Sequence, residues 1–129
     1  MTQPRLRVVL DTSAIVAYLQ ASIHVGETIA EIVDEGAGFG VPVVCLAEAV
    51  ALRMDGNGAS VDLLVGHPAC TLLPTSARDW RALASAARMV GRIDLGVALL
   101  AAVDHDAYVL TGEPGPYGGL VDDGPVIAI

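Results

Sequence analysis

Four acidic side chains stand out because each lies in or beside an apolar stretch. Asp11 directly follows an apolar run, Glu48 is the only charged residue in segment 43–52, Asp94 opens a long apolar stretch, and Glu113 closely follows another apolar run. A buried carboxylate is costly unless it is protonated, paired with an arginine or bound to a cation. These four positions are therefore the first candidates for chemistry.

Each acid also has an ordinary structural explanation. Asp11 and Asp94 are suitable helix N-caps, and Glu113 can be a loop acid. Glu48 can lie on a solvent-facing stripe, but its neighbours at i±3 and i±4 offer no intrahelical ion pair. Because the helix around Glu48 is apolar on nearly every side, we expect its carboxylate to be buried and functional.

Carboxylates that converge repel one another, and a hard divalent cation relieves the repulsion. Asp11, Glu48 and Asp94 have no evident local arginine partner, so they predict a site for Mg²⁺ or Mn²⁺. Such an ion lowers the pKa of bound water and shields a phosphate, which suits the hydrolysis of a phosphodiester. The hydroxyls of Ser13 and Thr111 can support these groups or merely cap and pack.

Short apolar strands alternate with helices along the chain. We expect strands at 7–10, 39–43, 70–73, 108–110 and 125–129, helices at 14–20, 24–35, 44–54, 76–90 and 94–104, a turn at 55–58 and a short helical stretch at 59–66. This alternation predicts βαβ units and a mainly parallel sheet. Asp11 and Glu113 follow strands, so both belong at the carboxyl edge of that sheet, where α/β proteins bind ligands.

Composition narrows the possible functions. The chain has 129 residues, 53% of them hydrophobic, which is the size of a single domain spanning 1–129. No stretch is long and apolar enough for a membrane span and no leader is recognisable, so we expect a cytoplasmic protein. All seven basic residues are arginine, which excludes lysine chemistry. Cys45 and Cys70 lack metal-ligand spacing and are expected to be small core residues.

The net charge of −8 does not favour general nucleic-acid binding, but the arginines are clustered. Arg78, Arg81, Arg88 and Arg92 fall on one face of a helix extended to residue 92, with Trp80 on the opposite, apolar face. This pattern is typical of an ordinary solvated face. The alternative is a phosphate-binding track that leads toward the acidic residues.

Segments 8–14, 41–48, 93–95 and 109–113 resemble, in this order, the motifs of PIN domains, and within that family those of VapC-type toxins from bacterial toxin–antitoxin pairs. The resemblance covers nearly the whole chain. It implies an α/β fold, a PIN-like three-layer α/β/α sandwich with a mainly parallel sheet. It also implies a Mg²⁺- or Mn²⁺-dependent endoribonuclease site built from Asp11, Glu48, Asp94 and Glu113.

In that site Asp11 and Asp94 would hold the principal ion, Glu48 would share it or orient water, and Glu113 would support a second ion or its waters. The resemblance further implies an RNA substrate, a homodimer and a small antitoxin protein whose tail reaches the site. The high hydrophobic fraction independently suggests apolar surface for a homodimer to cover. The alternative is a catalytically weak PIN-fold binding module, because a fold alone does not determine activity.

Overall fold

The chain folds around one five-stranded β-sheet in which every neighbouring pair of strands is parallel. The computed structural model describes residues 4–52 and 58–129. The strands are β1 (Leu6–Leu10), β2 (Gly38–Pro42), β3 (Cys70–Leu73), β4 (Tyr108–Thr111) and β5 (Val126–Ala128). The predicted strands and the parallel sheet are confirmed.

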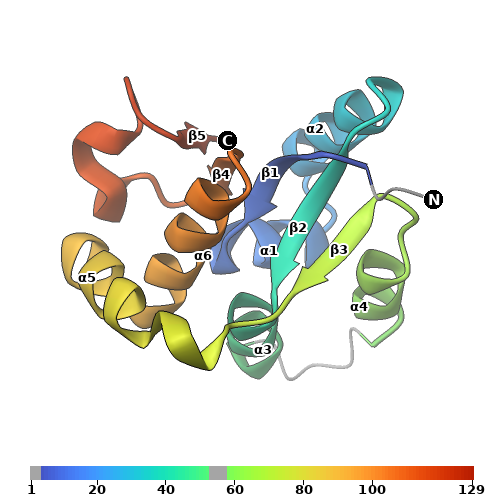
Figure 1. Cartoon of the computed structure of the whole chain (residues 1–129). Coiled ribbons are helices and arrows are strands. Elements are labelled where there is room, and N and C mark those ends of the chain that lie inside the picture. Colours follow the sequence, from blue (N-terminus) through green and yellow to red (C-terminus); the bar gives the residue numbers. More distant parts are fainter. Residues whose placement is uncertain (1–3, 53–57) are drawn as a thin grey trace.

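Helices connect the strands and cover both faces of the sheet. They are α1 (Thr12–Leu19), α2 (Ile23–Asp34), α3 (Val43–Leu52), α4 (Gly58–Val65), α5 (Trp80–Val90) and α6 (Ile93–Asp104), with 3₁₀ turns η1 (Ala77–Asp79) and η2 (Gly115–Leu120). Helices α1 and α2 lie on one face of the sheet, and α6, backed by α5, lies on the opposite face (Figure 1). The predicted three-layer α/β/α sandwich is thus confirmed.

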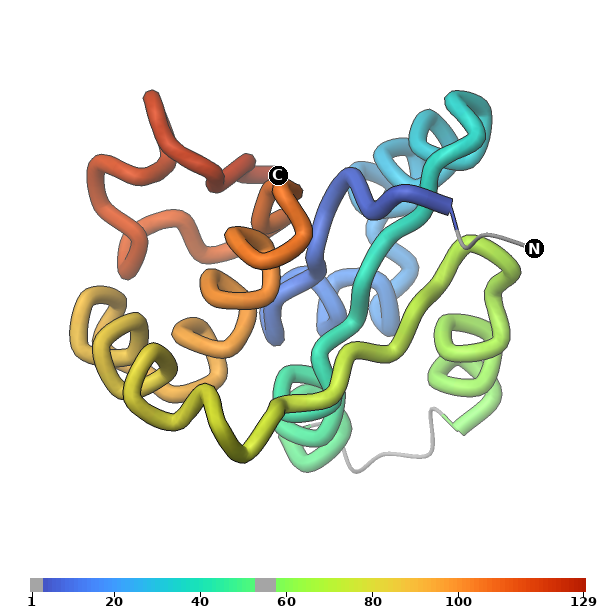
Figure 2. Tube along the Cα trace, viewed as in Figure 1, coloured from blue at the N-terminus to red at the C-terminus, as the bar shows by residue number. Residues whose placement is uncertain are grey.

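The order of the strands determines where a site can form. The chain moves outward from β1 to β2 and β3, then crosses back to place β4 on the other side of β1, giving the order β3-β2-β1-β4-β5 (Figure 2). The boundary between β1 and β4 is therefore the switch point, where the connections leave the sheet in opposite directions and a crevice opens. The strands are secured there by Val9, Leu10, Val109 and Leu110, all fully buried.

Two glycines determine how α5 meets α6. Gly91 ends α5 in the left-handed conformation, with φ of +85°, which glycine adopts at little cost. Gly96 lies where α6 approaches α5 most closely, since a Cβ there would stand 2.6 Å from the backbone nitrogen of Ala87. The close packing of the two helices brings the start of α6 to the switch point.

The helix expected at 76–90 is divided, and this changes the predicted arginine face. Arg78 lies in η1, Arg81 and Arg88 lie on α5, and Arg92 lies beyond the end of α5 in the connection to α6. Trp80, expected on an apolar packed face, is 60% exposed and stacks against the Arg81 guanidinium at 4.5 Å. The prediction of four arginines on one helix is wrong because Gly91 ends the helix before Arg92.

The remaining differences concern loops. No element was expected between residues 111 and 125, whereas the chain forms η2 there. The turn predicted at 55–58 lies largely outside the described residues, as does the predicted end of the helix at 53–54; Gly58 begins α4. Across the described residues, no helix combines the length and the apolar character needed to cross a membrane.

Candidate functional site

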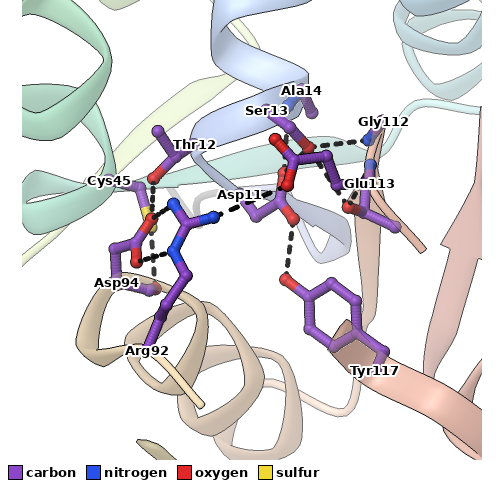
Figure 3. Close-up of polar contacts among 11 residues, drawn as sticks. Asp11, Thr12, Ser13, Ala14, Cys45, Arg92, Asp94, Gly112, Glu113 and Tyr117 are labelled. Atoms are coloured by element: carbon purple, nitrogen blue, oxygen red, sulfur yellow. Dashed lines mark hydrogen bonds and ion pairs between the residues drawn. The ribbon is translucent and has the colours of Figure 1, made fainter. Parts of the chain in front are cut away.

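Asp11 lies at the carboxyl end of β1 and is completely buried. Its Oδ1 accepts hydrogen bonds from the Ser13 hydroxyl (2.7 Å) and the Ala14 amide (2.9 Å), and its Oδ2 accepts one from the Tyr117 hydroxyl (2.7 Å) (Figure 3). The Ala14 bond makes Asp11 the N-cap of α1, so the structural explanation for this residue is realised. The two hydroxyl bonds exceed what a cap requires and fix both carboxylate oxygens.

Asp94 lies in the first turn of α6 and is only 7% exposed. Its Oδ2 accepts hydrogen bonds from the Thr12 hydroxyl (2.6 Å) and from Arg92 Nη2 (2.7 Å), and its Oδ1 accepts one from Arg92 Nε (3.1 Å). The N-cap position belongs to Arg92 and not to Asp94, so the capping explanation for Asp94 is wrong. Thr12 directly follows Asp11, and its bond therefore ties the two buried acids together.

Arg92 brings a positive charge into this acidic site. Besides its two bonds to Asp94, its Nη1 lies 3.6 Å from Glu113 Oε2, so one guanidinium bridges the two acids (Figure 3). The expectation that Asp94 lacks a local arginine partner is wrong, since that partner is two residues away in the sequence. The segment leading into α6 is extended at Arg92, with φ of −145° and ψ of 146°, which lets the side chain turn back onto Asp94.

Electrostatics of the Asp94–Arg92 pair follow from this geometry. Burial alone would raise the pKa of Asp94, but the hydrogen bonds from Thr12 and Arg92 and the charge of Arg92 outweigh burial and lower that pKa. The hydrogen bond to Asp94 in turn raises the pKa of Arg92. Asp94 is therefore a carboxylate and Arg92 a cation at every physiological pH.

Hydroxyl groups link Asp11 to the end of β4. Ser13 donates its only hydroxyl proton to Asp11, so Thr111, at 3.2 Å from the Ser13 oxygen, must be the donor of that contact. The Thr111 oxygen accepts the Glu113 amide (3.0 Å), and the Ser13 oxygen accepts the Gly112 amide (2.8 Å). Of the two roles open to these residues, Ser13 supports the Asp11 carboxylate directly, and Thr111 supports it through Ser13. The chain of bonds also fixes the backbone on which Glu113 sits.

Tyr117 and Thr12 are site residues that the sequence did not suggest. Tyr117 is 3% exposed and its hydroxyl reaches Asp11 from η2, 106 residues further along the chain. Burial, together with the charge of Asp11, raises the pKa of Tyr117, so the phenol remains a donor. The one signal for Tyr117 was an aromatic residue alone in a segment rich in glycine and proline.

Glu48 differs from the other acids. It lies on α3, where its side chain is exposed, and no hydrogen bond or ion pair joins it to Asp11, Asp94 or Arg92. The expectation that it is buried is wrong. Helix α3 packs against β2, α1 and α6 through the side that carries its buried residues, Cys45 and Ala49, and Glu48 is not on that side. Its role as a ligand remains a prediction, whereas contacts of Thr12 and Arg92 link Asp11, Asp94 and Glu113.

Cys45 borders the site as a structural group. It is fully buried, and its thiol donates to the backbone carbonyl of Asp94 at 3.2 Å. Burial, with a further contribution from the charges of Asp11 and Asp94, raises the pKa of this thiol to about 12. Cys70 is half-buried against the core. The prediction of two small core cysteines therefore holds for Cys45 fully and for Cys70 in part.

The donor chemistry of the site suits a hard cation, while its present geometry places an arginine on two of the acids. Two buried carboxylates and the nearby Glu113 supply only oxygen donors, the ligands that Mg²⁺ and Mn²⁺ prefer. As arranged, residues 4–52 and 58–129 contain no group of three acidic, histidine or cysteine side chains placed to hold one ion. In this arrangement, the guanidinium of Arg92 contacts both Asp94 and Glu113.

Comparison with known proteins supports the fold. Over 95% of its length the chain matches 98% of a chain in the crystal structure described as VapBC2 from Rickettsia felis bound to a DNA fragment from their promoter, with a TM-score of 0.71 and 12% sequence identity. No protein-family model matches the sequence, and no curated protein is similar to it. The chain therefore shares the fold of that chain, which agrees with the PIN-like three-layer sandwich that the sequence motifs predicted.

Proposed function

We propose that this protein is a metal-dependent endoribonuclease, the toxin of a VapBC-type toxin–antitoxin pair. The observation that carries the proposal is the burial of both Asp11 and Asp94, linked through Thr12, at the switch point of a PIN-like sheet. Asp94 neither faces solvent nor caps a helix, and Asp11 is held by more bonds than capping needs.

Asp11 and Asp94 are the residues that would hold Mg²⁺ or Mn²⁺, with Glu113 as a further oxygen donor and Glu48 as the acid that would orient the water. When bound, such an ion supplies a nucleophilic water of lowered pKa and offsets the charge of a phosphodiester. The acids alone would repel that phosphodiester. Binding of the substrate therefore depends on positive charge in the pocket.

The surrounding residues position these two acids. Thr12, Ser13 and Tyr117 donate hydroxyl protons to the carboxylates and so restrict their rotation, as outer groups do around metal ligands in general. The hydroxyl of Thr111 supports Ser13 in the same way. These bonds use lone pairs of Asp11 and Asp94 yet leave acceptor capacity on each, since a carboxylate offers about four acceptor positions.

An RNA substrate is supported by the exposed arginines outside the pocket. Arg81 and Arg88 lie exposed on α5, and Arg78 lies exposed in the turn before it. They remain candidates for phosphate contacts, although Arg92 lies apart from them beyond the end of α5. Trp80, stacked on Arg81, adds an aromatic face of the kind that unpaired bases stack against.

The proposed partners are a cognate antitoxin and a second copy of the chain, and the proposed location is the cytoplasm. The two partners are supported by large apolar side chains that are exposed, among them Trp80 (60%), Met89 (67%), Ile93 (58%) and Val103 (61%). Exposed apolar surface of this extent favours association. Sedimentation at micromolar concentration should show a dimer, and a monomer would contradict that part of the proposal.

The test is cleavage of a panel of defined single-stranded and looped RNAs by purified protein freed of any partner. We expect cleavage with Mg²⁺ or Mn²⁺, none in chelator, and recovery when metal is returned. Asp11→Asn should be inactive, whereas Asp104→Asn should retain activity because that exposed acid lies at the far end of α6.

Cleavage that persists in chelator or in Asp11→Asn would come from a contaminating nuclease and would contradict the proposal. Inactivity on every RNA, together with no binding of Mn²⁺, would favour the non-catalytic PIN-fold binding module. The close pairing of Asp94 with Arg92 is the feature that such a module would explain most simply.

A further inference from the structure

Arg92 is an unusual residue for the place it occupies. It is the N-cap of α6, where Ser, Thr, Asp and Asn are preferred, and it makes no capping hydrogen bond with its side chain. A cation at a helix N-terminus is also disfavoured by the helix dipole. Helix chemistry therefore gives no reason for an arginine here, and the reason must lie in what its guanidinium contacts.

Those contacts are the same carboxylates that the proposed function assigns to a metal. Arg92 donates from Nε and Nη2 to the two oxygens of Asp94, at 3.1 and 2.7 Å, and its Nη1 lies 3.6 Å from Glu113. A divalent ion binds through carboxylate lone pairs, so it competes with hydrogen bonds to those oxygens and with the charge already present. The two carboxylate oxygens of Asp94 therefore cannot be fully bound by Arg92 and by the ion at the same time.

We propose that Arg92 is a resident cation that competes with the divalent ion for Asp94 and Glu113 and thereby sets the affinity of the pocket for metal. The inference rests on the proposed function for the assignment of Asp94 as a metal ligand. It adds that the chain itself carries the group that neutralises the acids before metal arrives. Metal binding then includes displacement of Arg92.

The structure provides room for that displacement. A cavity of about 330 Å³ opens beside the site, and its lining includes Arg92, Glu113, Val16 and Gln20. The Arg92 side chain is 41% exposed, so a guanidinium that leaves Asp94 stays in contact with water. The cost of burying an unpaired charge therefore does not arise. By contrast, the hydroxyl of Thr12 is buried and remains on Asp94 in either state.

The test is Mn²⁺ binding to the full chain by isothermal titration calorimetry. Arg92→Gln should bind Mn²⁺ at least about tenfold more tightly than wild type, because a hydrogen bond to a charged group contributes about that factor. Arg92→Lys keeps the charge but loses the two-pronged contact, so its affinity should fall between the two. Arg88→Gln is the matched control, since it removes an exposed arginine of α5 and should bind as wild type does.

A second readout is made on the wild-type chain, with Arg92→Lys used only to assign the signal. The Arg92 Nε–H signal should shift when the wild-type protein is saturated with Mg²⁺. Equal affinities of Arg92→Gln and Arg88→Gln, or an unchanged Nε–H signal on saturation, would overturn the inference and leave the proposed metal site standing. No Mn²⁺ binding by any of the variants at millimolar concentration would overturn both.

Discussion

Helices α3 and α6 are both almost wholly apolar, and each carries one of the candidate metal-binding acids, Glu48 on α3 and Asp94 on α6. The two helices are nevertheless buried to very different extents. On α6, seven residues are buried, among them Asp94, Leu95, Val97 and Leu99. On α3 only Cys45 and Ala49 are buried. The difference therefore arises from position in the fold and not from composition.

The contacts of the two helices explain it. Helix α6 packs against β1, β2 and β4 and is covered by α5, whereas α3 contacts β2 and lies between α1 and α6 at the rim of the sheet. One side of α3 is left bare, and it exposes Val43 (46%), Val50 (36%) and Leu52 (63%). Glu48 shares the exposure of these neighbours, while Asp94 is enclosed.

This contrast teaches that an acid in an apolar helix is informative only when the helix is enclosed. Asp94 is held by Thr12 and Arg92 because burial of a carboxylate without partners would be costly. Glu48 is exposed to solvent, so its carboxylate does not need such partners. The same pattern, an acid in an apolar helix, thus has a different structural basis at Asp94 than at Glu48. Separate experiments on the two residues can distinguish these cases.

The largest expected difference is in activity. Asp94→Asn should reduce the rate of RNA cleavage by more than the roughly 10–100-fold that loss of an outer partner of a metal ligand costs. Glu48→Gln should reduce it by about tenfold or less, since an exposed side chain is held by fewer contacts. Rates measured on one RNA with Mn²⁺ decide the matter, and a loss in Glu48→Gln equal to that in Asp94→Asn would erase the distinction between the helices.

The next difference is in stability of the metal-free protein. Asp94→Asn should lower the free energy of unfolding by about 1–3 kcal/mol, because charged hydrogen bonds from Thr12 and Arg92 are weakened in a buried place. Glu48→Gln should change it by less than about 0.5 kcal/mol, as exposed substitutions do. Urea denaturation with chelator measures both. Stabilisation by Asp94→Asn would mean that repulsion among the acids outweighs these bonds.

Tyr117→Phe sharpens the account of how the enclosed acids are held. Removing the hydroxyl leaves Asp11 Oδ2 without its buried donor and should lower the free energy of unfolding by about 1–2 kcal/mol. The rate should fall by about tenfold, with little change in KM, since Tyr117 positions Asp11 rather than contacting RNA. Tyr18→Phe, on α1 away from these bonds, is the control. Wild-type kinetics in Tyr117→Phe would remove Tyr117 from the site.

The smallest effect concerns the two cysteines, Cys45 on the buried side of α3 and Cys70 at the start of β3. Burial raises the pKa of Cys45 to about 12 and that of Cys70 to about 11, so the reactive thiolate of each is scarce at pH 8 and increases as pH rises. Because Cys45 is also fully buried, iodoacetamide should modify Cys70 slowly and Cys45 hardly at all. Peptide mass spectrometry checks this, with denatured protein as control. Equal modification of both would mean that α3 opens readily.

Much of the fold was predictable because it depends on local sequence. Apolar runs such as Val8–Leu10, separated by helices, predicted the strands and the parallel sheet, and their carboxyl ends located Asp11 and Glu113. The glycine- and proline-rich segment around Tyr117 gave no such signal, since its 3₁₀ turn depends on packing. Glu48 was misplaced because periodicity in an all-apolar helix cannot indicate which side meets the sheet.

The site was predictable in its acids but not in their partners. Asp11 and Asp94 stand out by residue type and setting, whereas the role of Arg92 depends on a backbone that turns at Gly91 after α5 ends. That turn directs the side chain at Asp94 instead of along the helix face. The bond from Tyr117 to Asp11 spans 106 residues and is likewise set by the tertiary structure.

The most direct test is the position of the metal. Crystals of the wild-type chain soaked in Mn²⁺ should show, by anomalous scattering, an ion bound to carboxylate oxygens of both Asp11 and Asp94 at about 2.1 Å, with the Arg92 guanidinium moved off Asp94. Glu48 should be at most a water-mediated partner. An ion absent from Asp11 and Asp94, or found only on exposed acids such as Glu48, would contradict a metal-dependent nuclease site at the enclosed end of α6.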